Sequence, residues 1–226
     1  MEVTVTYHKH SGFSFRTASR LLVFDYIGGS LPDPVPGDNA IVFISHSHSD
    51  HCSPIAIDWH KRGLAELVTG YDVSRKAGGL RMKPGDGADI AGSRVEAFGS
   101  TDLGVSFLIN ADGASVFHAG DFNLWHWREQ SDAGEIADAM RSFTTILDTL
   151  RGRRVDIAFF PADPRLGEGY DEGAMLFAEA VKPRYIIPMH WWGETAVALA
   201  FSKKQMPQGV NALALTEPGL PIKINI

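Results

Sequence analysis

The stretch Ile41-Val-Phe-Ile-Ser-His-Ser-His-Ser-Asp-His-Cys-Ser-Pro54 joins an uncharged apolar run to a cluster of histidine and aspartate side chains. The run from Ile41 to Ile44 is typical of a strand that is buried on both faces. Side chains alternate between the two faces of a strand, so His46 and His48 should project to the same side. The stretch therefore predicts a strand that carries two imidazoles to one edge of a sheet.

The second half of the stretch supplies two more candidate ligands. Ser53 followed by Pro54 is the pattern of a helix N-cap and first helical turn. Asp50 and His51 should then lie in the tight loop between the strand and this helix. Imidazole and carboxylate groups suit zinc, iron or manganese, and their density here indicates a metal site.

The composition of the whole chain is that of a soluble globular protein. Of the 226 residues, 44% are hydrophobic and 21% are charged, and no linker divides them, so we expect one domain from residue 1 to 226. Basic residues are scattered, which predicts no nucleic-acid partner. The net charge of −6 does not exclude a small anionic substrate.

The cysteine content and the N-terminus favour a cytoplasmic protein. The single cysteine, Cys52, excludes an internal disulfide and fits a reducing compartment. The first seven residues alternate like a strand and lack the basic start and apolar core of a signal peptide. No apolar run approaches membrane-spanning length, so we expect no membrane contact.

The order of expected elements, many strands with helices between them, favours an α/β (α+β) protein built as a two-sheet sandwich with helices outside. The expected strands cover residues 3–7, 13–16, 21–25, 41–44, 65–68, 94–98, 105–109, 115–118, 155–160, 185–190, 210–215 and 222–226. The expected helices cover residues 55–61, 72–76, 132–150, 173–181 and 195–202.

Other strands also end in polar side chains. Asp121 follows Gly120 at a strand end, where its carboxylate is well placed to bridge two metals, and His190 ends an apolar strand. Asp163 and Arg165 follow another strand. Arg165 is suited either to hold a substrate carboxylate or phosphate, or to pair with a neighbouring acid.

These residues together carry a resemblance to a known family. The His-Ser-His-Ser-Asp-His signature, followed by Gly-Asp121 and Pro-Met-His190, resembles the metallo-β-lactamase superfamily in its metal-dependent hydrolase branch, over essentially the whole chain. The chain is similar to uncharacterised bacterial hydrolases of this branch, which are related to the ascorbate-6-phosphate lactonases. The resemblance implies a four-layer αββα sandwich with a binuclear metal centre. It implies that one metal is held by His46 and His48, the second by Asp50, His51 and His190, and that the bridge is Asp121.

One departure from the family pattern concerns the first metal. Most members have another histidine between the signature and the bridging aspartate, whereas this chain has Gly99-Ser-Thr-Asp102-Leu-Gly104 at that place. We predict that Asp102 replaces the imidazole. The competitor, His118, lies roughly 10 Å back along its strand from Asp121 at about 3.3 Å per residue, so we expect it to orient a ligand instead. Two zinc ions are expected, with manganese, iron or a single metal as alternatives, because an oxygen ligand weakens the preference for zinc.

The predicted chemistry is hydrolysis of a small ester, lactone or phosphoester. A hydroxide shared by two metals would attack the carbonyl or phosphoryl centre. Asp50 is expected to order or deprotonate the attacking water while it binds metal. His126 is the first candidate for a general acid, and packing among tryptophans is the alternative.

The remaining candidates support the site or contact the substrate. His10 precedes a turn from which it could approach the site, and the tryptophans beside the ligands form either an aromatic wall or core. These tryptophans are Trp125, Trp127, Trp191 and Trp192. The competing functions are a di-iron oxidoreductase and a catalytically silent metal-binding module. The sequence does not identify the oligomeric state.

Overall fold

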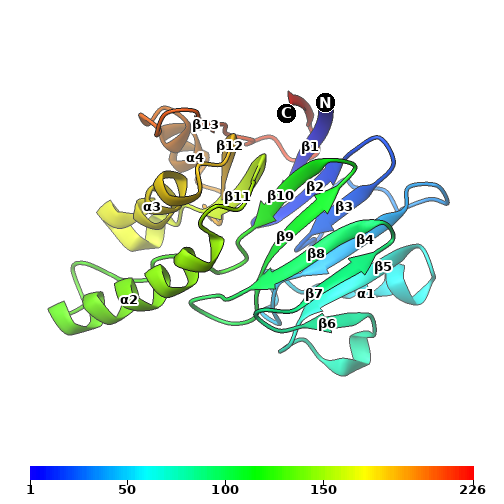
Figure 1. The fold of residues 1–226 in the computed structure, drawn as a ribbon, viewed down its shortest axis with the longest axis horizontal. Helices are drawn as coiled ribbons and strands as arrows, with labels where there is room; N and C mark the ends of the chain where they lie inside the picture. Colours follow the sequence, from blue (N-terminus) through cyan, green and yellow to red (C-terminus); the bar gives the residue numbers. More distant parts are fainter.

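Two seven-stranded mixed sheets pack against each other in the computed structural model, which describes residues 1 to 226 (Figure 1). In spatial order, the first sheet contains β14 (Pro221–Asn225), β1 (Glu2–Lys9), β2 (Gly12–Arg16), β3 (Leu21–Phe24), β4 (Ala40–Ile44), β5 (Ala65–Gly70) and β6 (Leu80–Met82). The second contains β13 (Asn211–Ala212), β12 (Tyr185–Met189), β11 (Ile157–Pro161), β10 (Ala114–His118), β9 (Ser106–Ala111), β8 (Ser93–Phe98) and β7 (Gly87–Ile90).

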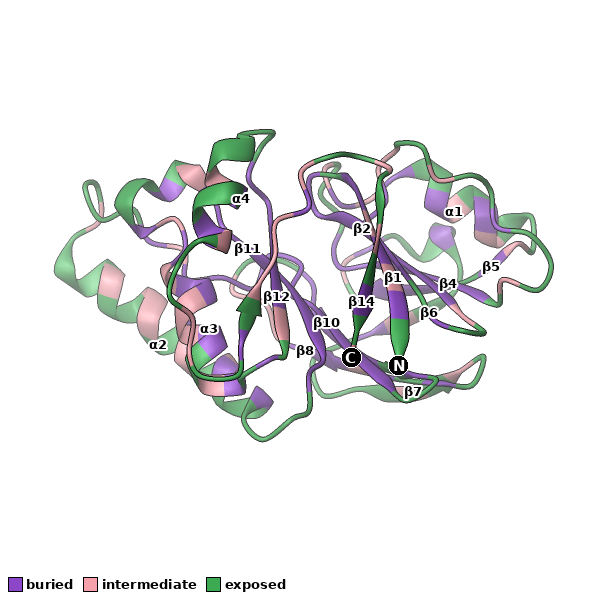
Figure 2. Cartoon of the chain, turned by 90° about the horizontal axis from the view of Figure 1, so that it is seen from above, coloured by how far each residue is buried: buried purple, intermediate pink, exposed green.

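Helices cover the outer faces of the two sheets. The view from above shows α1 on one side of the molecule and the other three α-helices on the opposite side (Figure 2). The helices are α1 (Pro54–Lys61), α2 (Ala133–Leu150), α3 (Glu172–Val181) and α4 (Thr195–Ser202), with short 3₁₀ helices η1 (Arg75–Ala77) and η2 (Pro164–Gly169). The predicted four-layer αββα sandwich is therefore confirmed.

The strand that precedes the histidine signature is buried on both faces. Ile41 and Phe43 of β4 face the large core between the sheets, whereas Val42 and Ile44 join a smaller core with Trp59 of α1. This alternation is what the uncharged sequence of β4 predicted. It fixes the end of β4, and with it the start of the signature.

Local signals set the helix starts that flank the site. The hydroxyl of Ser53 accepts a hydrogen bond from the N–H of Ile55, at 3.0 Å, and Pro54 begins α1. Asp132 caps α2 through a capping box with Glu135. Both helix starts are those that the sequence predicted.

The sequence did not predict two strands at the sheet edges, β6 and β7. Both are only partly buried, so the alternation of apolar residues that marks a strand is weak in them. The expected helix over residues 72–76 is only the single turn η1, and the expected strand over 210–215 shortens to β13.

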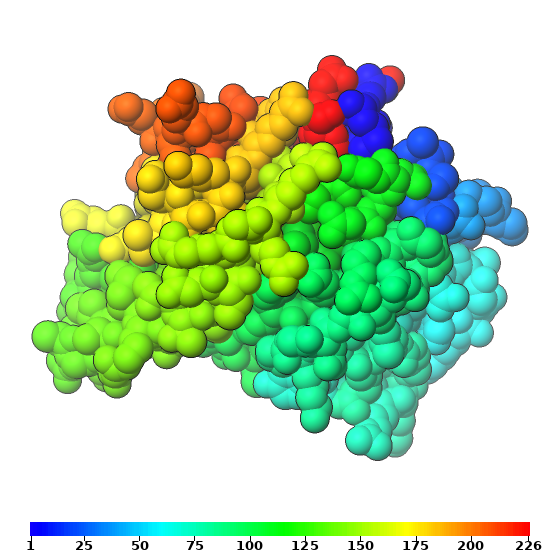
Figure 3. Space-filling model, in the orientation of Figure 1, coloured from blue at the N-terminus to red at the C-terminus, as the bar shows by residue number.

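The two ends of the chain lie together. β1 and β14 pair antiparallel, and the Met1 amino group donates a hydrogen bond to the carbonyl of Ile226. Figure 3 shows the first and last segments side by side on the surface. None of the helices has the length and apolar character needed to cross a membrane.

Stacking between the sheets generates a stability prediction. The rings of Phe13 on β2 and Phe159 on β11 stack with centroids 4.2 Å apart, and both are fully buried. Phe159→Ala should lower the free energy of unfolding by about 3 to 5 kcal/mol, because it removes the ring and leaves a cavity. The measurement is urea unfolding with a chelator present, so that bound metal does not contribute. Leu220→Ala, at a half-exposed side chain, should change the free energy of unfolding by less than about 0.5 kcal/mol. Equal losses in the two variants would contradict the prediction.

Candidate metal centre

The strand ends singled out in the sequence meet at one edge of the sandwich. They form two groups, each with ligand atoms within 4.8 Å of one another and so close enough to share a metal ion. The first group contains His46, His48 and Asp121. The second contains His10, Asp50, His51 and His190. The division between His46 with His48 and Asp50 with His51 and His190 is the one that the family resemblance implied, with His10 as an addition.

Asp121 lies between the two groups. Its Oδ1 is 3.1 Å from Nε2 of His51 and 3.3 Å from Nε2 of His190. Its Oδ2 is 3.3 Å from Nε2 of His46, which belongs to the other group. The two oxygens of one buried carboxylate thus face different sets of imidazoles, which is the geometry of a bridging ligand.

Asp25 and Ser45 orient the histidines that follow β4. Nδ1 of His51 lies 2.7 Å from Oδ2 of Asp25, and because a carboxylate only accepts, this nitrogen carries the proton. Nδ1 of His46 lies 2.9 Å from the hydroxyl of Ser45, which itself donates to Asp25 at 2.7 Å. Fixing Nδ1 in this way aims each Nε2 at the centre. The sequence analysis did not single out Asp25; its only signal was an acid at the end of an apolar strand.

Asp163 orients the histidine that follows β12. Its Oδ2 lies 2.8 Å from Nδ1 of His190 and accepts a hydrogen bond from the indole N–H of Trp192 at 3.2 Å. Arg165 binds both oxygens of the same carboxylate, with its Nε 3.0 Å from each. Of the two alternatives for Arg165, the structure shows the pairing with a neighbouring acid.

The donor set fits a metal cation. The Nε2 atoms of His10, His51 and His190, together with Oδ1 of Asp121, are buried and have no hydrogen-bond partner. Buried polar atoms are normally paired, because leaving them unpaired costs free energy. One cation among these four atoms would satisfy them all, and imidazole with carboxylate suits zinc, manganese or iron.

Nearby carboxylates keep His51 protonated when no metal is bound. Burial lowers the pKa of His51, but the carboxylates of Asp25 and Asp121 outweigh burial and raise this pKa to about 10. Burial raises the pKa of Asp121, but His51 above all, with His190 and His46, holds it well below its usual range. The metal-free centre therefore has a protonated His51 beside an ionised Asp121 at neutral pH.

Asp102 lies outside both groups of ligand atoms. Its side chain is exposed on the loop between β8 and β9, and it lines a cavity of about 280 Å³ together with Asp121. Trp125, Trp127 and Arg165 line the same cavity. Its role as a metal ligand stays a prediction, with the shared cavity as its structural support.

His118 supports the turn that carries the bridging aspartate. Its Nε2 donates to the carbonyl of Ser11 at 2.8 Å, and its Nδ1 accepts from the N–H of Gly120 at 3.2 Å. Gly120 has a φ of 55°, and a Cβ there would lie 2.7 Å from Cβ of Ser45, so this turn requires glycine. These contacts fit the predicted orienting role of His118.

His126 is buried next to the start of α3. Its Nε2 lies 3.1 Å from Oε2 of Glu172, at the start of α3, and the residue does not line the cavity at Asp121. The general-acid role of His126 stays a prediction, and its contacts describe a histidine held by Glu172.

Some of the tryptophans lie at the site and others in the core, the two alternatives expected from the sequence. Trp125 donates from its indole N–H to the carbonyl of Asp121 at 2.8 Å. Trp191 is buried, with its ring 5.0 Å from that of Tyr7, and belongs to the core. Trp127 and Trp192 are 39% and 46% exposed, and Trp127 lines the cavity at Asp121 together with the half-buried Trp125.

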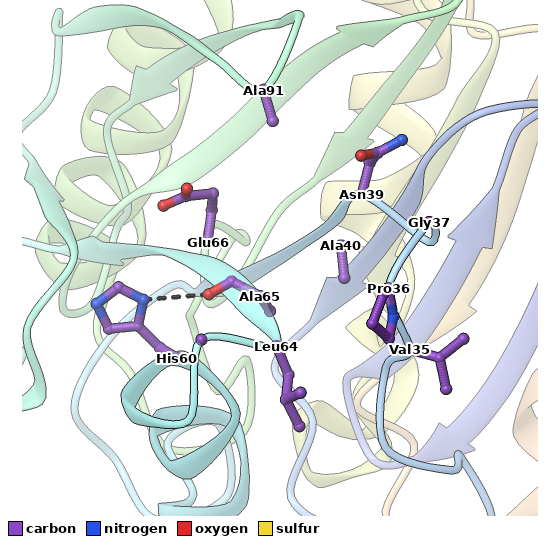
Figure 4. A pocket seen from close by; sticks show the side chains of 11 residues that line it. Val35, Pro36, Gly37, Asn39, Ala40, His60, Leu64, Ala65, Glu66 and Ala91 are labelled. Carbon is purple, nitrogen blue, oxygen red and sulfur yellow. Dashed lines mark hydrogen bonds between the residues drawn. The ribbon is translucent and has the colours of Figure 1, made fainter.

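Of two further cavities, one adjoins the centre and the other lies away from it. One of about 390 Å³ is lined by His10, Asp50 and Trp192, and so adjoins the second ligand group. The other, of about 340 Å³, is lined by Ala40 and His60 (Figure 4). Because Ala40 begins β4 and the histidine signature follows its end, this last cavity is separated from the ligands by the length of the strand.

Comparisons with known proteins agree with this geometry. Residues 4–140 match the family model for the beta-lactamase superfamily domain. A metal-dependent hydrolase from Opitutus terrae is 30% identical over 217 residues, which cover 83% of this chain and 84% of that protein.

Solved structures share the fold. Igni18, a metallo hydrolase from the archaeon Ignicoccus hospitalis, has a TM-score of 0.66 at 18% identity, with all of both chains covered. CmlA, a diiron beta-hydroxylase from Streptomyces venezuelae, has a TM-score of 0.59 at 14% identity, over 99% of this chain and 54% of that one. The fold is therefore compatible with more than one chemistry.

Metal binding should release protons. Because the pKa of His51 is about 10 without metal, this imidazole is protonated at pH 7 and must lose its proton to bind a cation. We expect about one proton or more released per chain, and an apparent zinc affinity that rises about tenfold per pH unit for each proton between pH 6 and 8. Calorimetric titrations in buffers of different protonation enthalpy count these protons. Affinity independent of pH would contradict the prediction.

The carboxylate behind His190 should matter for metal affinity. Asp163→Asn removes the charge that fixes the His190 tautomer and its pairing with Arg165, so zinc affinity should fall about 10- to 100-fold. Competition with a chromophoric chelator measures this. Asp148→Asn, at an exposed ion pair on α2, is the matched control and should leave affinity unchanged. Wild-type affinity in Asp163→Asn would show that the contact does not orient the ligand.

Proposed function

This chain belongs to the beta-lactamase superfamily, as one of its metal-dependent hydrolases, and we propose that it uses two metal ions to hydrolyse a small ester, lactone or phosphoester. The observation that carries the proposal is the position of Asp121 between two groups of imidazoles. A carboxylate shared in this way supports a centre with two cations. The buried, unpartnered ligand atoms around it support the same conclusion.

The proposed ligands divide between the two ions. The first ion is held by His46, His48 and Asp121, and the second by Asp50, His51, His190 and Asp121. Asp102 is the proposed further oxygen ligand of the first ion, since it lines the same cavity as Asp121. Zinc is the proposed metal, and the carboxylates also suit manganese or iron.

The chain's own residues position the reaction. When bound, the two cations supply Lewis-acid activation of water and of a substrate oxygen. Asp50 is held as a carboxylate, because the imidazole of His10, with its Nε2 3.4 Å from Oδ2 of Asp50, keeps the pKa of Asp50 far below the usual range. It is therefore able to accept a hydrogen bond from the attacking water and to order it, whereas the lowered pKa makes Asp50 a weaker acceptor of that water's proton.

The cavity at Asp121 suits a small-molecule substrate. Its volume of about 280 Å³ is near the lower end of small-molecule sites, which run from about 300 to 1,000 Å³. Trp125 and Trp127 give it an apolar wall, and Arg165 adds a cation at its edge. These walls support a substrate with a planar or apolar group beside the bond that is cleaved.

Metal analysis with activity screening tests the proposal. Wild-type protein purified without added metal should contain two metal ions per chain and hydrolyse members of a panel of esters, lactones and phosphodiesters. Asp121→Ala should retain at most one ion and lose more than about 100-fold in hydrolysis, because both groups lose a shared ligand. Asp102→Ala should lose about one ion. His60→Gln, on α1 and outside the centre, is the control and should match the wild type.

The outcomes separate the competing functions. Two ions without turnover of any substrate would favour a catalytically silent module. Iron with a visible absorption band would favour the oxidoreductase. Absence of metal from the wild type, even after incubation with zinc or manganese, would overturn the proposal.

A further inference from the structure

His10 stands in a turn whose conformation is unusual for its residue type. β1 ends at Lys9 and β2 begins at Gly12, and these two residues pair, so His10 and Ser11 form a two-residue hairpin loop. His10 has a φ of 53°, in the left-handed region. Asparagine and glycine take this position most readily in such turns. Imidazole at a strained turn position therefore points to a function for the side chain.

The side chain of His10 reaches the second ligand group. Its Nε2 lies 3.4 Å from Oδ2 of Asp50, and its ring lies 4.1 Å from that of His190 and 5.4 Å from that of His51. This Nε2 has no hydrogen-bond partner, although the residue is only 7% exposed. An imidazole with one unpaired buried nitrogen among other ligand atoms is poised to bind the same cation.

Backbone contacts hold His10 in this position. Its N–H donates to the hydroxyl of Tyr7 at 3.0 Å, which fixes the loop against its own strand. Its carbonyl accepts the N–H of His190 at 3.5 Å, so the hairpin of the first sheet touches the ligand loop of the second. His190 has a φ of 63°, so both residues in this contact adopt the left-handed conformation.

We propose that His10 is a direct ligand of the second metal ion, beside Asp50, His51 and His190. The inference rests on the proposed metal-dependent function and adds to it. With Oδ1 of Asp121, five side chains of this protein would then hold the second ion. The first ion would be held by His46, His48 and Asp121, with Asp102 as the proposed fourth ligand, and the exposed His48 leaves this site more open to water and substrate.

The two sites would therefore differ in affinity. The second ion would bind first and exchange more slowly, because more side chains hold it. The first ion would bind more weakly. The alternative is that His10 only orients Asp50 through the 3.4 Å contact, without binding metal.

The number of imidazoles on the first equivalent of metal separates these alternatives. X-ray absorption fine structure of wild-type protein with one equivalent of zinc should show three imidazole ligands. His10→Asn should show two, and its affinity for this equivalent, measured by chelator competition, should fall by more than about 100-fold. Asparagine tolerates the positive φ, so the turn is kept.

His8→Asn is the matched control. His8 lies on β1, the strand that leads into the His10 turn, is 3% exposed and contacts Ser14 outside both groups, so this variant should keep three imidazoles. Two imidazoles in the wild type, or an unchanged count in His10→Asn, would overturn the inference. The wild-type measurement decides the question even where the variants fold poorly. A wild type that binds no zinc would instead remove the proposed function itself.

Discussion

The carboxylate of Asp121 lies within 3.1 to 3.3 Å of imidazoles from His46, His51 and His190, in a region almost closed to water. Buried charged groups are tolerated only when each is paired, because removing one partner leaves an uncompensated charge. The surrounding carboxylates meet this condition by holding Nδ1 of His51 and His190 from behind. The inner nitrogens are thus left in fixed positions, ready for a cation, and the orienting contacts are as much a part of the centre as the ligands.

The centre joins the two sheets. His46 and His51 follow β4 of the first sheet, whereas Asp121 and His190 follow β10 and β12 of the second. The strand end is packed so closely that a Cβ on Gly104, from the neighbouring loop, would lie 2.1 Å from the carbonyl oxygen of Ser45. The positions of these side chains therefore depend on how the sheets pack, and small changes in that packing would alter the distances between them.

The sequence predicted those parts of the site whose structure depends on neighbouring residues alone. The strand before His46, the cap at Ser53 and the place of His190 all follow from alternation and turn chemistry, and the structure has these elements where the sequence placed them. Asp25 escaped notice because its role depends on a contact with a residue 26 positions away. Which groups the His10 side chain contacts depends on how its hairpin packs against the other sheet. The position of the Asp102 side chain depends on the conformation of its loop. The spacing of residues in the sequence predicts neither of these.

The division of ligands between distant parts of the chain has a consequence for biosynthesis. Roughly 140 residues separate His51 from His190, so the ribosome needs on the order of 10 s to reach the second half of the centre. The nascent chain carries the histidine signature without Asp121 for about the first half of this interval, and without His190 for all of it. A metal captured then would lack these ligands and could exchange with the cellular pool. We therefore expect the full ligand set to select its metal only after translation, when the strand ends of both sheets have come together.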